Sequence, residues 1–225
     1  MLLDGQVLLT LSITTRIFIW ETKTRSESET MTDLTSINSS RTGMASESRN
    51  IIDHYHYWNH EAILADLDSR ANNFSIICSN LYNDFNIATC IRNANAFLAK
   101  RVFIYGSKQY DRRGTVGTHH YVRSVHCGTL DRLVQGLDTL GEQVGPLHLV
   151  AMDNVENSIS LESYQWPTNK HAVIILGQEQ VGVPPELLQM AQDTVYITQY
   201  GSVRSLNVGT ASGIAMYDYC KKVIV

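Results

Sequence analysis

The sequence predicts an α/β fold in which a mostly parallel sheet carries helices on both faces. From about residue 74 onward, short apolar segments alternate with amphipathic segments, as in sheets whose parallel strands are joined by helices. The segment 171–176 is apolar at nearly every position, which indicates a strand buried on both faces. A chain of 225 residues is long enough to bury the core of such a domain.

Each expected element follows from its own local pattern. Residues 53–69 and 86–98 have apolar side chains at helical spacing, and Ile87, Ile91 and Leu98 form one stripe of the second helix. Short apolar segments predict strands over residues 74–78, 102–105, 147–152, 171–176 and 194–198. The remaining expected helices are one marked by Leu130, Leu133, Val134 and Leu137, a short one over 184–190 with proline at its start, and a last one from about 206 to 222.

Residues 1–48 are expected to be a disordered extension or a segment that precedes the true start of the protein. Within residues 22–48, 13 of 27 residues are serine or threonine, and such a tract buries too little apolar surface to offset its ordering entropy. Met31 and Met44 lie inside it, so an internal start is a hypothesis that the intact mass of the native protein tests. Residues 49–72 are expected to form an N-terminal helical segment, and residues 73–225 the main domain.

Composition narrows the class of protein. The formal charge of −4 does not indicate a strongly basic nucleic-acid-binding protein. Locally, however, six basic residues and one acidic residue lie between residues 100 and 123, where they form either a phosphate-binding surface or an ordinary solvated face. The basic residues are Lys100, Arg101, Lys108, Arg112, Arg113 and Arg123. Because the four cysteines form no CxxC pair and no apolar run is long enough to span a bilayer, we expect a cytoplasmic protein without disulfides, metal or membrane contact.

Three loops contain the candidate functional residues, because ligands of parallel sheets bind where strands end and loops lead into helices. In the first, Arg92 follows Asn86 by six residues, nearly two helical turns later, and interrupts an apolar surface. In the second, Gly177 and Gly182 flank Glu179 directly after a buried strand, so that the backbone can approach a ligand.

The third loop leads into the last helix and contains Arg204, Ser205, Leu206 and Asn207. The first N–H groups of a helix bind anions such as phosphate. Glycines 209 and 213 within this helix indicate the close approach of another backbone. Each loop by itself also has a purely structural explanation: an arginine that reaches solvent, a glycine-containing turn, and a serine that caps a helix.

Together, in this order and spacing, the three loops resemble the three motifs of the SpoU/TrmH group of the SPOUT superfamily of RNA methyltransferases. These motifs are an Asn with an Arg six residues later, a glycine turn of LGxE type after a strand, and an SLN sequence before the terminal helix. The resemblance covers roughly residues 74–222. It implies a C-terminal trefoil knot, S-adenosylmethionine (SAM) as cofactor, a homodimer, and methylation of a ribose 2′-oxygen in tRNA or rRNA.

The resemblance also implies a role for each site residue. Gly177, Ile197 and Leu206 would contact SAM, and Glu179 and Gly182 would shape the same loop, with Met152 a weaker candidate. Arg92 would be the catalytic arginine. Because an arginine keeps its charge in proteins, we expect it to bind phosphate and stabilise the developing alkoxide. Asn86 and Asn207 would position Arg92 or the ribose, Ser205 would bind the adjacent phosphate, and Arg112, Arg113 and Arg204 are expected to bind RNA.

Two other functions remain open from the sequence. One is an RNA-binding SPOUT dimer that has lost catalysis, and the other is a flavodoxin-like nucleotide-binding module, which would leave the three motifs unexplained. His54, His56 and His60 are expected to be surface imidazoles. His56 and His60 are one helical turn apart, but the sequence places no suitable third metal ligand beside this pair. Only about 25 residues that are expected to be ordered precede the first strand, which are too few for a separate RNA-binding domain. This favours tRNA as the target, or help from a partner protein, over an rRNA target bound through such a domain.

Overall fold

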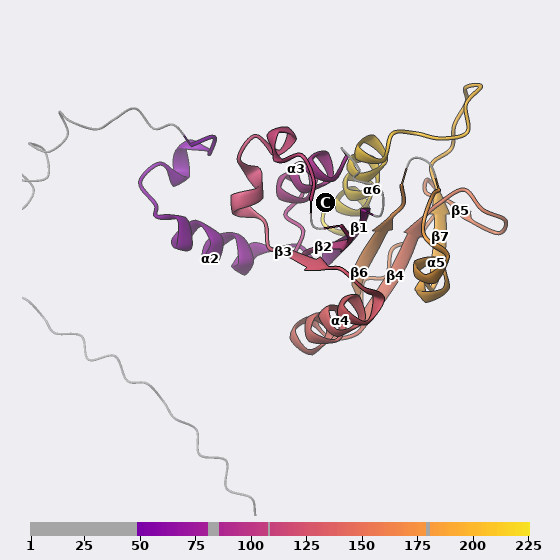
Figure 1. Cartoon of the computed structure of the whole chain (residues 1–225), viewed down its shortest axis with the longest axis horizontal. Coiled ribbons are helices and arrows are strands. Elements are labelled where there is room, and N and C mark those ends of the chain that lie inside the picture. Colours follow the sequence, from indigo (N-terminus) through magenta and orange to yellow (C-terminus); the bar gives the residue numbers. More distant parts are fainter. Residues whose placement is uncertain (1–48, 81–85, 108, 179–180) are drawn as a thin grey trace, which may run out of the picture. The chain divides into compact units, whose positions relative to one another are not determined.

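The computed structural model describes residues 49–80, 86–107, 109–178 and 181–225. The disorder and the internal start predicted for residues 1–48 therefore lie outside the described residues, and so do Glu179 and Lys108. The short 3-10 helices are η2 (Asp53–Tyr55), η3 (Arg112–Thr115) and η4 (Thr118–Tyr121). The α-helices are α2 (His60–Arg70), α3 (Ile87–Ala96), α4 (Leu130–Val144), α5 (Pro185–Met190) and α6 (Val208–Val223). The strands are β1 (Phe74–Asn80), β2 (Val102–Gly106), β3 (Ser124–Cys127), β4 (Leu147–Met152), β5 (Ile159–Ser160), β6 (His171–Leu176) and β7 (Asp193–Tyr196) (Figure 1).

Within the described residues, seven strands form one sheet in the order β3-β2-β1-β6-β4-β7-β5, and every neighbouring pair is parallel. In the middle of the sheet, Ile76 of β1 pairs with Val102 of β2 on one side and with Ile174 of β6 on the other. The chain builds the β1–β3 half first and then the other half. This topology confirms the predicted fold class, whereas the trefoil knot that the resemblance implies stays a prediction.

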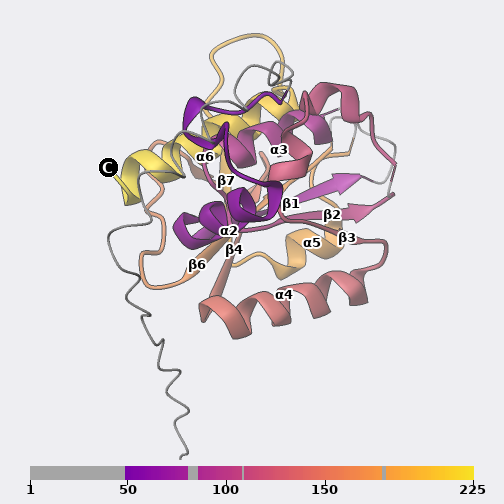
Figure 2. The same cartoon turned by 90° about the vertical axis from the view of Figure 1, so that its left-hand side faces the viewer.

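Helices cover both faces of the sheet, as the sequence predicts (Figure 2). Helices α3 and α6 pack on one face, over a core that includes Ile76 and Ile174. Helices α4 and α5 pack on the opposite face, over a core that includes Ile77 and Ile175. Successive residues of a strand point to opposite faces of the sheet. Because helices cover both faces, two residues that follow one another along a central strand are both buried, and such strands are rich in consecutive apolar residues.

Several elements differ from the sequence prediction. The helix expected over 53–69 is divided, because Asn59 caps α2 by accepting a hydrogen bond from the Ala62 backbone N–H at 2.8 Å. Strands β3 and β5 were not predicted from the sequence. Strand β3 lies at a sheet edge with exposed side chains, and β5 has only two residues, so neither has a clear apolar pattern. The last strand ends at Tyr196, and α6 begins at Val208, two residues after the expected start.

The segment before β1 is joined to the sheet through Asp68 of α2. Its carboxylate accepts hydrogen bonds from Arg101 Nη1 at 3.1 Å and from Arg123 Nε at 2.8 Å. Its backbone carbonyl accepts a hydrogen bond from Lys100 Nζ at 3.0 Å. Three of the six basic residues between positions 100 and 123 therefore hold α2 in place.

His171, at the start of the central strand β6, is expected to make folding sensitive to pH. Its side chain is 1% exposed, and its ring nitrogens lie 2.8 Å from Ser75 Oγ and 2.8 Å from Asn73 Oδ1. Burial, together with nearby Lys100 and Arg101, lowers the pKa of His171 to about 4. Because the unfolded chain takes up this proton near pH 6.5, we expect stability to fall as the pH drops from about 6.5 to 4, by up to about 3 kcal/mol.

Urea unfolding over a series of pH values measures this loss of stability. The variant His171→Asn is the control. It is expected to be less stable at neutral pH, because its packing and hydrogen bonds change, but to lose less stability as the pH falls. Equal pH dependence of the two proteins would show that His171 is not the group responsible.

Candidate active site

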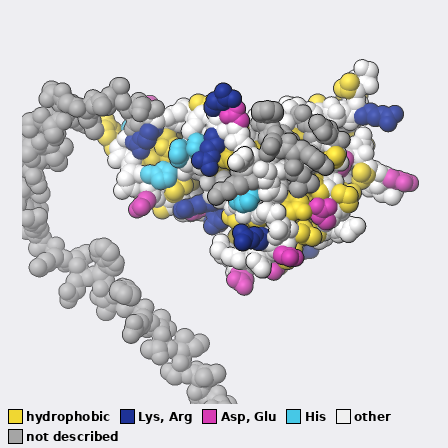
Figure 3. Space-filling model, viewed as in Figure 1, with side chains coloured by type: hydrophobic (Ala, Val, Ile, Leu, Met, Phe, Trp, Pro, Cys, Tyr) yellow, Lys and Arg dark blue, Asp and Glu magenta, His cyan; other side chains and the backbone are white. Residues whose placement is uncertain are grey.

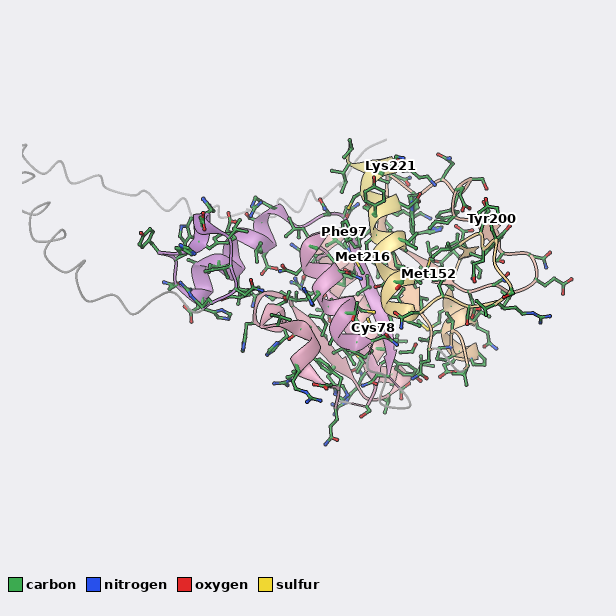
Figure 4. All side chains as sticks on the ribbon, turned by 90° about the horizontal axis from the view of Figure 1, so that it is seen from above. Cys78, Phe97, Met152, Tyr200, Met216 and Lys221 are labelled. Carbon is green, nitrogen blue, oxygen red and sulfur yellow. The ribbon has the colours of Figure 1, made fainter. Side chains whose placement is uncertain are left out.

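A cavity of about 300 Å³ lies beyond the carboxyl ends of β4, β6 and β7. This is where parallel sheets bind their ligands, and the volume is at the lower end of the range for small-molecule sites. Met152 at the end of β4 lies beside α6, whereas Tyr200 projects outward on the side away from α2 and is 95% exposed (Figure 4). The described lining residues are Met152, Asp153, Asn154, Leu176, Gly177, Gln178, Val181, Gly182, Val195, Tyr196, Ile197, Gln199, Arg204, Ser205, Leu206, Val208 and Ala211.

The turn after β6 has a geometry that requires both of its glycines. Gln178 and Gly182 exchange two backbone hydrogen bonds, of 2.8 and 2.9 Å, which close the turn. A Cβ atom on Gly177 would lie 2.4 Å from the carbonyl carbon of Gly182, and Gly182 itself has a φ of +69°, in the left-handed region. Backbone therefore lines this side of the cavity. The predicted contacts of Gly177 and Gly182 with a cofactor stay predictions, and Glu179 lies outside the described residues.

Asp153 is a residue of this site that sequence reasoning missed. Its Oδ2 accepts a hydrogen bond from the Val183 N–H at 2.8 Å, and its Oδ1 accepts one from the Asn154 N–H at 2.8 Å. A Cβ atom on Gly182 would lie 2.7 Å from Asp153 Oδ2, so the carboxylate packs directly against the turn. Its place immediately after β4 is the signal that points to it, by the same strand-end rule that identifies the other loops.

The third predicted loop meets both the cavity and helix α3. Asn207 caps α6, because its Oδ1 accepts a hydrogen bond from the Thr210 N–H at 3.1 Å. Its Nδ2 donates to Asn86 Oδ1 at 2.7 Å, across 121 residues of sequence. Besides Gly177 and Gly182, five predicted residues line the cavity: Met152, Ile197, Arg204, Ser205 and Leu206. The structure therefore brings most of the predicted second-loop and third-loop residues to one place and joins them to Asn86.

Helices α3 and α6 pack closely where α6 has glycines. A Cβ atom on Gly209 would lie 2.7 Å from Thr89 Cγ2, and one on Gly213 would lie 3.2 Å from Asn93 Nδ2. Asn93 also donates hydrogen bonds to the Gly209 carbonyl and to Ser212 Oγ, both at 2.9 Å. The close contacts at the two glycines are thus made by side chains of α3 and not by the second backbone that the sequence led us to expect, and they hold α3 against the first half of α6.

Arg92 lies on the exposed side of α3 and is not among the described residues that line the cavity. Helix η3 packs against the same α3, since a Cβ atom on Gly114 would lie 2.8 Å from Ala88 Cβ. Arg112 and Arg113 of η3 are both exposed. Figure 3 shows Lys, Arg and His side chains gathered over α2 and η3. The predicted catalytic arginine and two predicted RNA-binding arginines therefore belong to elements that are packed together.

Arg112 and Arg113 differ in their capacity to bind an anion. Arg113 forms an ion pair with Asp111, with Nη2 and Oδ2 2.6 Å apart, and its hydrogen bonds lower the pKa of Asp111 to about 2. Arg112 instead lies over the ring of Tyr110, with its guanidinium carbon 6.0 Å from the ring centroid. Because Asp111 already neutralises Arg113, we expect a phosphate to bind more strongly to Arg112 than to Arg113.

The histidines of the N-terminal segment do not converge on one point. The ring of His54 lies 5.3 Å from that of Trp58, and the ring of His60 lies 5.4 Å from that of Tyr121. His56 instead lies 3.7 Å from Asp53. Across the described part of the chain, no three His, Cys, Asp or Glu side chains are grouped so that they could hold a metal ion.

Comparisons with known proteins identify the family. A sequence model described as the SpoU rRNA Methylase family matches residues 73–217. The tRNA (guanosine(18)-2'-O)-methyltransferase of Aquifex aeolicus (strain VF5) is 28% identical over 156 residues, which are 68% of this chain and 71% of that relative. The enzyme of the same name from Escherichia coli (strain K12) is 27% identical over 155 residues, 68% of this chain and 65% of the relative.

Solved structures show the same fold. The A. aeolicus TrmH/SpoU tRNA modifying enzyme superposes with a TM-score of 0.59 at 23% identity, covering 72% of this chain and 83% of the other. The SpoU methyltransferase AviRb from Streptomyces viridochromogenes superposes with a TM-score of 0.59 at 20% identity, covering 67% and 60% of the two chains. The family match extends over the whole sheet and most of α6. This chain therefore belongs to the SpoU rRNA Methylase family.

Proposed function

We propose that this chain transfers a methyl group from SAM to a ribose 2′-oxygen of tRNA or rRNA. The observation that carries the proposal is the segment 204–207. Ser205 and Leu206 of this segment line the cavity, while Asn207 hydrogen-bonds Asn86 at the start of the helix that carries Arg92. One short segment thus joins a cofactor-sized cavity to the proposed catalytic helix. The relatives named above are guanosine 2'-O-methyltransferases, and AviRb has also been solved in complex with AdoMet.

The cavity fits SAM in its lining and its backbone geometry. Gly177 leaves the strand end open to close approach, and apolar side chains such as Ile197 and Leu206 suit an adenine ring. Glu179 is proposed to shape the same turn together with Gly182. When bound, SAM supplies a methyl group that is already activated by its positively charged sulfonium. The protein is then left with orienting the ribose hydroxyl and helping it to lose its proton.

Arg92 is proposed to bind the phosphate beside the target ribose and to stabilise negative charge on the 2′-oxygen. A guanidinium donates paired hydrogen bonds to phosphate and keeps its charge, so it suits this role better than that of a base. Asn86, held by Asn207 at 2.7 Å, orients Arg92 or the ribose. Ser205 is exposed just before the first turn of α6, where helix N–H groups favour an anion, and is proposed to bind the adjacent phosphate.

Arg112, Arg113 and Arg204 are proposed to bind the RNA backbone, and their loss is expected to weaken RNA binding at every sequence. Each lost phosphate contact lowers the slope of log affinity against log salt by about 0.7–0.9. We expect Arg112→Ala to weaken binding several-fold and Arg113→Ala to weaken it less, because Asp111 already pairs with Arg113. Filter binding at several salt concentrations measures both effects. Unchanged affinity in the Arg112→Ala/Arg113→Ala double variant would remove η3 from the RNA surface.

A homodimer is also proposed, and the exposed side of α6 supports it. Ile214 and Tyr217 on that side are 37% and 57% exposed, and the ring of Phe97 lies 6.4 Å from that of Tyr217. Apolar side chains in one patch are suited to a second copy of the chain. Sedimentation equilibrium tests this proposal, and a monomer at micromolar concentration would contradict it.

The RNA target and the cellular location are also proposed. We propose tRNA before rRNA as the target, because the A. aeolicus and E. coli relatives named above are tRNA methyltransferases. We propose a cytoplasmic location, because the relatives named above modify tRNA and the four cysteines of the sequence form no CxxC pair. In the described part of the chain, no helix combines the length and apolar character needed to cross a bilayer. Microscopy of the tagged full-length protein tests the location.

Methyl transfer from labelled SAM to total RNA tests the proposed function. The RNA comes from cells that lack this protein, so that its target nucleotide is unmodified. We expect label in RNA with the wild-type protein. Binding of RNA and SAM without any transfer would instead support the catalytically inactive RNA-binding dimer.

A further inference from the structure

Asp153 has a distinctive place among the described residues that line the cavity, because it is the only acidic side chain there. Among the same described lining residues, Arg204 is the only arginine or lysine, and it lies in the loop before α6 rather than at a strand end. The carboxylate is held by the N–H groups of Val183 and Asn154, both at 2.8 Å. Asp153 therefore presents a fixed negative charge at the cavity wall.

The cofactor and its product differ in charge at a single atom. SAM has a positively charged sulfonium, whereas S-adenosylhomocysteine (SAH), which remains after methyl transfer, has a neutral thioether. Their adenosine and amino-acid groups are identical, so contacts with those groups stabilise both compounds equally. A fixed carboxylate at the cavity wall attracts the positively charged sulfonium of SAM but has no comparable attraction for the neutral thioether of SAH.

We propose that Asp153 determines cofactor specificity by making the cavity prefer SAM over SAH. The same difference in charge favours release of the product once the methyl group has moved to RNA. This role is separate from the contact of Asp153 with the turn at Gly182, which stabilises the cavity whichever compound is bound. The inference rests on the proposed use of SAM as cofactor.

Isothermal titration of the full chain with SAM and with SAH tests the inference, and its readout is the ratio of the two dissociation constants. Asp153→Asn keeps the shape of the side chain and removes its charge. We expect this variant to lose roughly tenfold more affinity for SAM than for SAH. Asp153→Glu keeps the charge and is expected to retain most of the preference for SAM even where its absolute affinities fall. Asn154→Ala, which changes a neutral neighbour in the cavity, is expected to leave the ratio unchanged.

The ratio separates the electrostatic role from a structural one. Loosening of the turn at Gly182 weakens SAM and SAH alike, so an equal loss for the two compounds in Asp153→Asn would overturn the inference while leaving the proposed function intact. Wild-type protein that binds neither compound would overturn the proposed function, and the inference with it.

Discussion

Replacing Arg92 with alanine is expected to lower kcat for methyl transfer by about 10²–10³-fold and to leave the Kd of SAM unchanged. The side chain is exposed on α3 and lies outside the described lining of the cavity, so its removal leaves the cofactor site intact. The charge proposed to stabilise the 2′-oxygen is lost, however. Arg92→Lys keeps a charge without the paired donors and is expected to recover only part of the rate.

Single-turnover transfer assays and SAM titration measure the two quantities separately. Arg132→Ala is the matched control, because Arg132 is an exposed arginine on α4, on the opposite face of the sheet from α3. This control is expected to retain full activity. A comparable loss of rate in both variants, or a loss of SAM binding in Arg92→Ala, would contradict the assigned role.

The second large effect is expected at Gly177, where alanine should abolish measurable SAM binding and lower the free energy of unfolding by about 2 kcal/mol or more. The added Cβ would lie 2.4 Å from the carbonyl carbon of Gly182 and 2.6 Å from the Val183 nitrogen. Backbone atoms cannot turn away as a flexible side chain can. Relief of this clash would therefore break the hydrogen bonds between Gln178 and Gly182 that close the turn.

Gly201→Ala is the control for this variant. A Cβ atom at Gly201 meets nothing within 4 Å, although the residue lies only a few positions from Arg204 and Ser205 of the cavity wall. We expect near wild-type stability and SAM affinity in this control, measured by urea unfolding and by titration. Wild-type SAM affinity in Gly177→Ala would show that the turn does not form the cofactor site.

The fold followed from apolar patterning because strands β1, β2 and β6 in the middle of the sheet are buried on both faces. Strands β2 and β6 are nearly continuous apolar runs, and β1 contains the apolar residues Phe74, Ile76, Ile77 and Cys78, so these segments are hard to mistake for loops. Strand β3 escaped prediction because three of its four residues are exposed or half-buried at the sheet edge. The division between η2 and α2 depends on a single capping bond at Asn59, which helical spacing does not detect.

The candidate site was only partly readable from the sequence. The strand-end rule identified Gly177, Ser205 and their neighbours, because it depends on local order along the chain. The pairing of Asn86 with Asn207 depends on how α3 meets α6, and spacing along the chain does not contain that information. Asp153 was missed because one acidic residue after a strand is common, and its hydrogen bond to Val183 appears only in three dimensions.

The most direct test of the central claim is mass spectrometry of nucleosides from RNA that the purified protein has methylated with SAM. A methyl group on ribose remains with the sugar fragment when the glycosidic bond breaks, whereas a methyl group on a base leaves with the base. We predict a 2′-O-methylated nucleoside with the wild-type protein and almost none with Arg92→Ala. A methylated base, or equal methylation by the two proteins, would contradict ribose methylation through Arg92.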